Sequence, residues 1–254
     1  MTLRIAMWSG PRNLSTAMMR SFGSRADTFV SDEPFYGCFL ETSGADHPMR
    51  VEVIAAMDCD WQSVIASLRG PIPKGQSLKR GTVPNVWYQK HMWHHMTGPI
   101  GYDDFAGFTH AFLIRDPARM IASYLRMRES AAFADFALER QAEFFEREAD
   151  RLGHAPAVID ANDVLASPEG VLSKLCAALG IPWDPAMLSW PPGRRDTDGP
   201  WAPHWYGAVE KSTGFGAPEK DQVELPEEAR HLAERCRPYY ERLAAFRLGA
   251  GRTP

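Results

Sequence analysis

Five short apolar runs alternate along the chain with segments in which apolar residues recur at helical spacing. The runs have the length of buried strands and lie at residues 3–9, 28–31, 86–90, 110–114 and 157–160. Strands that alternate with helices through right-handed crossovers form a parallel sheet covered on both faces. We therefore predict an α/β fold of three layers, with a central parallel sheet of about five strands flanked by helices.

Two segments interrupt this alternation. Residues 70–76 are rich in glycine and proline and predict a loop. Residues 182–218 have little periodicity, but their aromatic content argues against disorder, and we expect a lid there. Three of its aromatic residues would stack on a base, shape a pocket or simply pack in the core, and these are Trp201, Trp205 and Tyr206. A helix at residues 226–246 and a frayed tail at 249–254 complete a single domain over residues 1–254.

A polar loop joins the first predicted strand to a helix. Its sequence, at residues 9–16, is Ser-Gly-Pro-Arg-Asn-Leu-Ser-Thr. Backbone N–H groups, the first amides of the helix, two hydroxyls and the guanidinium of Arg12 would surround one small volume. The loop therefore predicts a phosphate or sulfate site. The alternative is a helix start that is merely capped by its serine and threonine.

The loop differs from that of magnesium-dependent nucleotide hydrolases. Those proteins carry G-x-x-x-x-G-K-[ST], in which a second glycine and a lysine precede the residue that holds magnesium. Five positions after Gly10 the chain has Ser15 and then Thr16, so both of these residues are absent. The cation stands earlier, at Arg12.

This arrangement resembles the 5'-phosphosulfate loop of sulfotransferases that use 3'-phosphoadenosine 5'-phosphosulfate (PAPS). Arg115 ends the predicted strand at 110–114, and Ser123 lies about two turns along the next helix, which resembles the 3'-phosphate motif of that family. Residues 158–182 resemble the strand, turn and helix that follow this motif. The chain is therefore similar to PAPS-dependent sulfotransferases, and the resemblance implies a P-loop NTPase-like fold.

The resemblance points to a divergent, bacterial-looking branch of the family. Some of its members carry a branched-chain aminotransferase-like label. That chemistry needs a lysine that forms a Schiff base with pyridoxal phosphate and an acidic partner for the ring nitrogen. No lysine of this sequence stands in such a setting, so the sequence does not support the label.

The resemblance also implies roles for individual residues. PAPS would be the co-substrate and adenosine 3',5'-bisphosphate the product. Residues of the loop would bind the 5'-phosphosulfate, and these are Arg12, Asn13, Leu14, Ser15 and Thr16. Arg115 and Ser123 would bind the 3'-phosphate. Lys211 stands where the family has a basic loop over that phosphate, although the family's wording is absent and a solvated lysine beside Glu210 is the alternative.

Sulfuryl transfer needs cations at the bridging oxygen, where negative charge develops as the bond breaks. Arg12 and Lys90 are our candidates, and with them no metal is expected. A base must also take the proton of the acceptor. Glu33, after the second predicted strand, and His91, directly after Lys90, are two open candidates. Histidine suits neutral pH without tuning, whereas a glutamate would need its pKa raised by burial.

Three histidines raise the question of a metal site. His91, His94 and His95 would share one face of a helix. A zinc site would also want a carboxylate or thiolate at similar spacing, and none is visible in the sequence. We therefore expect a histidine-rich acceptor pocket or surface, and no metal.

The composition limits the partners. The net charge of -4 over 254 residues does not indicate nucleic-acid binding, and no apolar run has membrane-spanning length. Four cysteines without metal or disulfide spacing, and no leader before the first strand, lead us to expect a cytoplasmic protein without membrane contact. A homodimer stays open.

The sequence therefore predicts an enzyme that transfers a sulfuryl group from PAPS to a hydroxyl or amine of a small acceptor. The transfer would be in-line and metal-independent. One alternative is a nucleotide-binding protein without transfer activity. The other is a P-loop kinase or NTPase, against which the position of Thr16 argues.

Overall fold

The computed structural model describes residues 2–73, 84–218 and 223–249. The predicted loop residues 74–76 and most of the predicted tail lie outside these ranges. The elements in chain order are β1 (Leu3–Ser9), α1 (Ser15–Gly23), β2 (Thr28–Asp32), α2 (Tyr36–Ser43), α3 (Arg50–Ala56), α4 (Trp61–Arg69), β3 (Val86–Met92), η2 (Trp93–His95), η3 (Tyr102–Phe105), β4 (Thr109–Ile114), α5 (Pro117–Leu125), α6 (Phe133–Phe136), α7 (Leu138–Leu152), β5 (Ala157–Asp160), α8 (Ala161–Ala166), α9 (Pro168–Ala178), η4 (Pro185–Leu188), α10 (Ala202–Trp205), α11 (Gly207–Lys211) and α12 (Glu227–Ala244).

The five strands form one parallel sheet in the order β2-β3-β1-β4-β5. The prediction of an α/β fold with five parallel strands is confirmed. All five strands lie where the apolar runs predict them. The main difference is β3, which continues to Met92 instead of ending at Lys90. His91 is therefore a strand residue and does not follow the strand.

The chain divides into two compact units. Unit 1 contains Met1–Met7, Thr16–Thr109 and Ala186–Gly214, and unit 2 contains Trp8–Ser15, His110–Pro185 and Phe215–Pro254. Both units are therefore built from segments that are distant in sequence. The single domain expected from the sequence stays a prediction.

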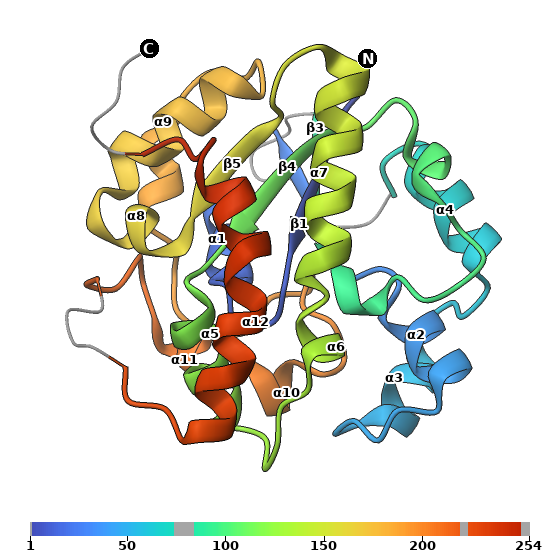
Figure 1. Ribbon diagram of the computed structural model, residues 1–254. Coiled ribbons are helices and arrows are strands. Elements are labelled where there is room, and N and C mark those ends of the chain that lie inside the picture. Colours follow the sequence, from blue (N-terminus) through green and yellow to red (C-terminus); the bar gives the residue numbers. More distant parts are fainter. Residues whose placement is uncertain (1, 74–83, 219–222, 250–254) are drawn as a thin grey trace. The chain divides into compact units, whose positions relative to one another are not determined.

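Unit 1 is built on the pairing of β2 with β3, in which Asp32 is aligned with Lys90. Every residue of β3 is buried, which explains why its sequence does not alternate between apolar and polar residues. Tyr88 stacks on Phe22 of α1, with ring centroids 4.3 Å apart. Outside the sheet, α2 packs against α3 (Figure 1).

Residues 182–218, where a lid is expected, form a segment that we call the tryptophan-rich segment, and its residues 186–214 belong to unit 1. It contains helices η4, α10 and α11 in place of a wholly irregular chain. Two serines of unit 1 attach it, since Ser21 Oγ donates to Met187 O at 2.8 Å and Ser24 Oγ donates to Ser189 O at 2.9 Å. Arg20 binds both carboxylate oxygens of Asp198, at 2.5 and 2.7 Å. The segment is thus held by polar contacts, and those of Ser21 and of Asp198 are buried.

Unit 2 is centred on α12, which packs against α5 and α7 (Figure 1). The side chains of Met120, Phe136 and Cys236 are fully buried in the hydrophobic core of this unit. The amphipathic pattern at residues 226–246 therefore predicted the helix to within two residues at each end. Among the described residues, no helix is long and apolar enough to cross a membrane.

We predict that Leu243→Ala lowers the free energy of unfolding by about 2–5 kcal/mol, because it leaves a cavity at a side chain that is 1% exposed. Leu152→Ala is the matched control, since Leu152 is 38% exposed, and it should cost about 1 kcal/mol or less. Urea unfolding of both variants measures the difference. Equal losses would contradict the assignment of α12 to the core.

Candidate active site

The polar loop after β1 has a strained backbone. Arg12 and Leu14 adopt φ angles of 62° and 67°, in the left-handed region that costs an L-residue about 1–2 kcal/mol. Gly10 makes a close approach as well, because a Cβ there would lie 3.3 Å from the carbonyl oxygen of Phe136. Strain of this kind persists where the surrounding structure holds it, and it is concentrated at binding sites.

Unit 2 brings together three of the residues predicted to bind the nucleotide. Arg12 Nε donates to Ser123 Oγ at 3.1 Å. Arg115 donates from its guanidinium to the carbonyl oxygen of Arg12. Asn13 is buried, with its amide 3.4 Å from Leu113 O, and Ser15 is also buried. The loop and the predicted 3'-phosphate motif are thus parts of one structure, which we call the arginine cluster (Arg12, Arg115, Ser123 and Arg126).

The arginine cluster is electropositive. Burial lowers the pKa of Arg12, and the charges of Arg115 and Arg126 lower it further. The part of this shift that comes from Arg115 and Arg126 reflects repulsion between like charges in the folded protein. An anion placed among them would relieve this repulsion. The donor set therefore fits a phosphate or sulfate ester.

In unit 1, Lys90 is the centre of a second group of polar residues, which we call the lysine cluster (Thr16, Asp32, Glu33, Lys90 and Tyr206). The side chain of Lys90 is 1% exposed. Its Nζ lies 2.9 Å from Asp32 Oδ1, 2.6 Å from Glu33 Oε1 and 3.2 Å from Thr16 Oγ1. Asp32 ends β2 and Glu33 follows it, and both lie beside Lys90 because the register pairs Asp32 with Lys90.

Tyr206 connects the lysine cluster to the tryptophan-rich segment. Its hydroxyl accepts a hydrogen bond from Lys90 Nζ at 2.6 Å and donates to Asp32 Oδ2 at 2.7 Å. Trp201 Nε1 donates to the same hydroxyl at 3.0 Å. The backbone N–H of Gly199 donates to Asp32 Oδ2 at 3.1 Å. Asp32 is therefore bound by a lysine, a tyrosine and a backbone amide.

The charges of the lysine cluster shift one another. Burial lowers the pKa of Lys90, but the carboxylates of Asp32 and Glu33 raise it by more, so this pKa lies well above its usual range. Burial raises the pKa of Glu33; the charge of Lys90 opposes this rise and the charge of Asp32 adds to it. Lys90 is thus a cation, and the carboxyl group of Glu33 has an increased affinity for a proton.

Glu33 has further features of a functional residue. Its φ angle of 39° is unusual for a non-glycine residue. Its Oε2 lies 3.7 Å from His95 Nδ1, and the ring of His95 stacks on Tyr36 with centroids 4.4 Å apart. Burial holds the pKa of His95 well below its usual value. Glu33 therefore lies between a cation and a neutral imidazole.

His91 lies on the other face of β3. Its Nε2 is 3.1 Å from Oε1 of Gln89, two residues earlier on the same strand. Neighbouring residues of a strand point to opposite faces, so Gln89 and His91 share a face and Lys90 points away from them. The ring of His91 lies against Phe35 and Phe105. Of the two candidate bases, Glu33 alone is in contact with Lys90.

A family comparison decides the class of protein to which these clusters belong. The sequence model of the Sulfotransferase domain family matches residues 3–246. The chain belongs to the sulfotransferase family. The fold agrees, because the sulfotransferase domain of the curacin biosynthetic pathway superposes with a TM-score of 0.56 at 18% identity, over 92% of this chain and 97% of that domain.

Two curated relatives are similar in sequence to this sulfotransferase chain. They are the branched-chain-amino-acid aminotransferase-like proteins 2 and 1 of Arabidopsis thaliana, with 34% identity over 237 residues and 35% over 236. Each match covers 93% of this chain but 40% of the relative. The chain therefore spans less than half the length of these proteins.

Two further site predictions of the sulfotransferase chain concern Lys211 and the three histidines. Lys211 is exposed at the end of α11, and its role stays a prediction. The three histidines do not share a helical face, because His91 belongs to β3 while His94 and His95 form the short helix η2. Within the described residues, no group of three or more histidines, cysteines and carboxylates could hold a metal ion.

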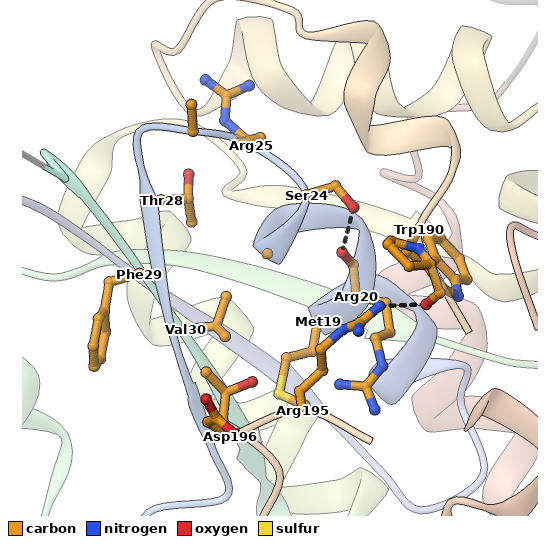
Figure 2. A pocket seen from close by; sticks show the side chains of 14 residues that line it. Met19, Arg20, Ser24, Arg25, Thr28, Phe29, Val30, Trp190, Arg195 and Asp196 are labelled. Atoms are coloured by element: carbon orange, nitrogen blue, oxygen red, sulfur yellow. Dashed lines mark hydrogen bonds between the residues drawn. The ribbon is translucent and has the colours of Figure 1, made fainter. Parts of the chain in front are cut away.

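Unit 1 contains a pocket of about 200 Å³ (Figure 2). No residue of the lysine cluster is among those that line it. The end of α1, the start of β2 and residues 190–197 line it. Thr28 and Val30 place it at the amino end of β2, opposite to Asp32. Ligands of parallel sheets bind at the carboxyl ends of the strands. The lysine cluster is therefore a better candidate for the chemistry than this pocket.

The sequence predictions missed several residues of the two clusters. Asp32 was not among the predicted site residues, and Tyr206 was recognised only as an aromatic residue. Arg126 was not singled out at all. A usable signal existed for Asp32, because a lysine inside an apolar strand must be paired with a carboxylate. No comparable signal pointed to Tyr206, which lies 116 residues from Lys90.

The buried histidines predict an acid-sensitive stability. Burial lowers the pKa of His94 to about 3, whereas an unfolded histidine has a pKa of about 6.5. Between these values the unfolded chain binds a proton that the folded chain does not. The free energy of unfolding should therefore decrease as the pH is lowered through this range, by up to about 1.4 kcal/mol per pH unit for this residue.

Urea unfolding between pH 7 and pH 4.5 measures this dependence. We predict a shallower slope for His94→Gln than for the wild type. His154→Gln, at an exposed position, is the control and should keep the wild-type slope. An unchanged slope in His94→Gln would show that His94 is protonated in the folded protein.

Proposed function

We propose that the protein transfers a sulfuryl group from PAPS to a hydroxyl or amine of a small acceptor. The observation that carries this proposal is the arginine cluster, in which the strained loop after β1 and the residues after β4 bind each other directly. An electropositive cluster of this kind suits a ligand with separate phosphate groups. Because the chain spans 40% of its curated relatives, its donor and acceptor are proposals of ours.

Different residues of the arginine cluster bind the two phosphate groups of the sulfuryl donor. Arg115 and Ser123 bind the 3'-phosphate, and Arg12 binds the 5'-phosphosulfate. The loop contributes backbone N–H groups and hydroxyls through Asn13, Leu14, Ser15 and Thr16. Lys211 assists at the 3'-phosphate, as the resemblance to the family implies. Adenosine 3',5'-bisphosphate leaves as the product.

The transfer itself is an in-line displacement at sulfur. The acceptor oxygen or nitrogen forms a bond to sulfur while the bond from sulfur to the bridging phosphate oxygen breaks. Its electron pair stays on the bisphosphate, where Lys90 and Arg12 stabilise the developing negative charge. The acceptor proton moves to Glu33. Side chains supply all of these roles, so the proposed reaction needs no metal.

Glu33 is the better candidate base for two reasons. Its raised pKa increases its affinity for the acceptor proton, as general-base catalysis near neutral pH requires. It also contacts Lys90 directly, so that the proton acceptor and the cation are neighbours. His91 faces Gln89 and two phenylalanine rings instead.

The proposal extends to the setting of the reaction. We propose a cytoplasmic enzyme with a small-molecule acceptor and a nucleotide donor as its partners. A protein that binds the nucleotide without transferring sulfuryl is the alternative, and product release distinguishes the two. Turnover of ATP that depends on magnesium would favour a P-loop kinase or NTPase instead.

We predict that Arg115→Ala weakens the binding of adenosine 3',5'-bisphosphate by about 10- to 100-fold, because it removes a charged hydrogen-bond donor to the 3'-phosphate. Isothermal titration calorimetry measures this affinity. Arg151→Ala is the matched control, since its side chain is 55% exposed and paired with Glu148, and it should bind like the wild type. Equal affinities of wild type and Arg115→Ala would refute the assignment of the 3'-phosphate.

We predict that Glu33→Gln lowers kcat for sulfuryl transfer by about 10²- to 10⁴-fold, which is the contribution of a general base. His91→Gln should retain most of the activity, because His91 lies on the other face of β3. Steady-state release of adenosine 3',5'-bisphosphate from PAPS, with an acceptor present, gives both values. If His91→Gln is the inactive variant and Glu33→Gln is not, the two roles are reversed.

A further inference from the structure

We infer that Tyr206 is a positioning residue that holds the ammonium of Lys90 in place for sulfuryl transfer. The inference rests on the proposed function and adds to it a residue that the family resemblance does not supply. It also gives a purpose to the tryptophan-rich segment, in which Tyr206 lies. Three sets of contacts support the inference: those of Lys90, those of the Tyr206 hydroxyl and those of the chain next to Trp201.

Lys90 has more partners than it has protons. An ammonium group carries three N–H donors, but four oxygen atoms lie within reach of Nζ. They belong to Thr16, Asp32, Glu33 and Tyr206, at distances of 2.6 to 3.2 Å. At least one contact can therefore be exchanged for a contact to a substrate oxygen without leaving a proton of Lys90 unbound.

The hydrogen bond from Lys90 to the Tyr206 hydroxyl stays in place throughout the reaction. The hydroxyl uses its single proton for Asp32 and accepts hydrogen bonds from both Lys90 and Trp201. Its hydrogen-bonding capacity is thus completely used. Tyr206 is 4% exposed and Trp201 is 1% exposed. A fully satisfied and buried hydroxyl fixes the position of the cation that it contacts.

The chain on both sides of Trp201 is also fixed. The carboxylate of Asp198 is buried and bound by both terminal nitrogens of Arg20. The next residue, Gly199, donates its N–H to Asp32. The segment therefore reaches Asp32 through its backbone and through Tyr206. Asp32 and Tyr206 together form the fixed side of the Lys90 site.

Glu33 forms the exchangeable side. Its contact with Lys90 is an ion pair, which weakens when the carboxylate takes the proton of the acceptor. Lys90 then has a donor for the bridging oxygen, while Asp32 and Tyr206 keep its position. Proton uptake by Glu33 and stabilisation of the leaving group by Lys90 are thereby linked in one step.

The test is Tyr206→Phe, which keeps the ring and removes only the hydroxyl. We expect kcat to fall by about 10- to 100-fold, the loss that a displaced catalytic group produces. The KM for PAPS and the affinity for adenosine 3',5'-bisphosphate should stay within about twofold, because Tyr206 is not assigned to nucleotide binding. Tyr240→Phe is the matched control. It removes another hydroxyl that is hydrogen-bonded to a carboxylate, that of Asp160 in unit 2, and should leave kcat unchanged.

Lys90→Met and the double variant Lys90→Met/Tyr206→Phe decide whether Tyr206 acts through Lys90. If it does, the double variant has the same kcat as Lys90→Met alone. An independent, multiplicative loss would overturn the inference, and so would a wild-type kcat in Tyr206→Phe. A loss in Tyr206→Phe that appears mainly in KM, or with equal size in Tyr240→Phe, would also overturn it.

The wild type, Tyr206→Phe, Lys90→Met and the double variant form a double-mutant cycle. This cycle separates a failure of this inference from a failure of the proposed function. If the wild type does not transfer sulfuryl from PAPS, the proposed function fails. The cycle is then measured in urea-unfolding midpoints. A smaller effect of Tyr206→Phe in the Lys90→Met background than in the wild type supports the Tyr206–Lys90 contact. Equal effects in both backgrounds overturn the inference.

Discussion

The buried ammonium of Lys90 is the constraint on which the candidate site depends. A lysine placed inside a strand that is buried on both faces loses its hydration, at a cost of several kcal/mol. The protein compensates with two carboxylates at the end of β2 and with the hydroxyl of Tyr206. These partners in turn determine where the tryptophan-rich segment lies, because Tyr206 and Gly199 both bind Asp32. One charge therefore organises a strand end, a carboxylate pair and a segment that is distant in sequence.

In the arginine cluster, by contrast, the neighbouring charges have the same sign. Arg12, Arg115 and Arg126 bring like charges together, and two residues of the loop adopt left-handed backbone angles. Neither feature stabilises the folded chain, so both are best explained by a ligand that carries negative charge. Lys90 has its counter-charges built into the fold, whereas the charges next to Arg12 include those of two further arginines, Arg115 and Arg126. This contrast supports the assignment of the donor phosphates to the arginines.

The fold could be predicted well because its signals are local. Apolar runs gave all five strands, and the order of residues in the loop and around Arg115 indicated the sulfotransferase family. The partners of Lys90 could not be predicted equally well. Tyr206 reaches Lys90 only through the path of the chain after β5, and this path has no periodicity that predicts its contacts. The position of His91 was missed because β3 continues two residues beyond its predicted end, which moves the histidine into the strand and onto the face opposite to Lys90.

A crystal structure with adenosine 3',5'-bisphosphate bound is the most direct test of the central claim, that this chain is built to hold a PAPS-type donor. The account predicts the 3'-phosphate within hydrogen-bond distance of Arg115 and Ser123, and the 5'-phosphate on the N–H groups of the loop that contains Arg12. It would be contradicted by a nucleotide whose phosphates contact none of these residues. A nucleotide bound in the pocket beside Trp190 (Figure 2) would be such a result.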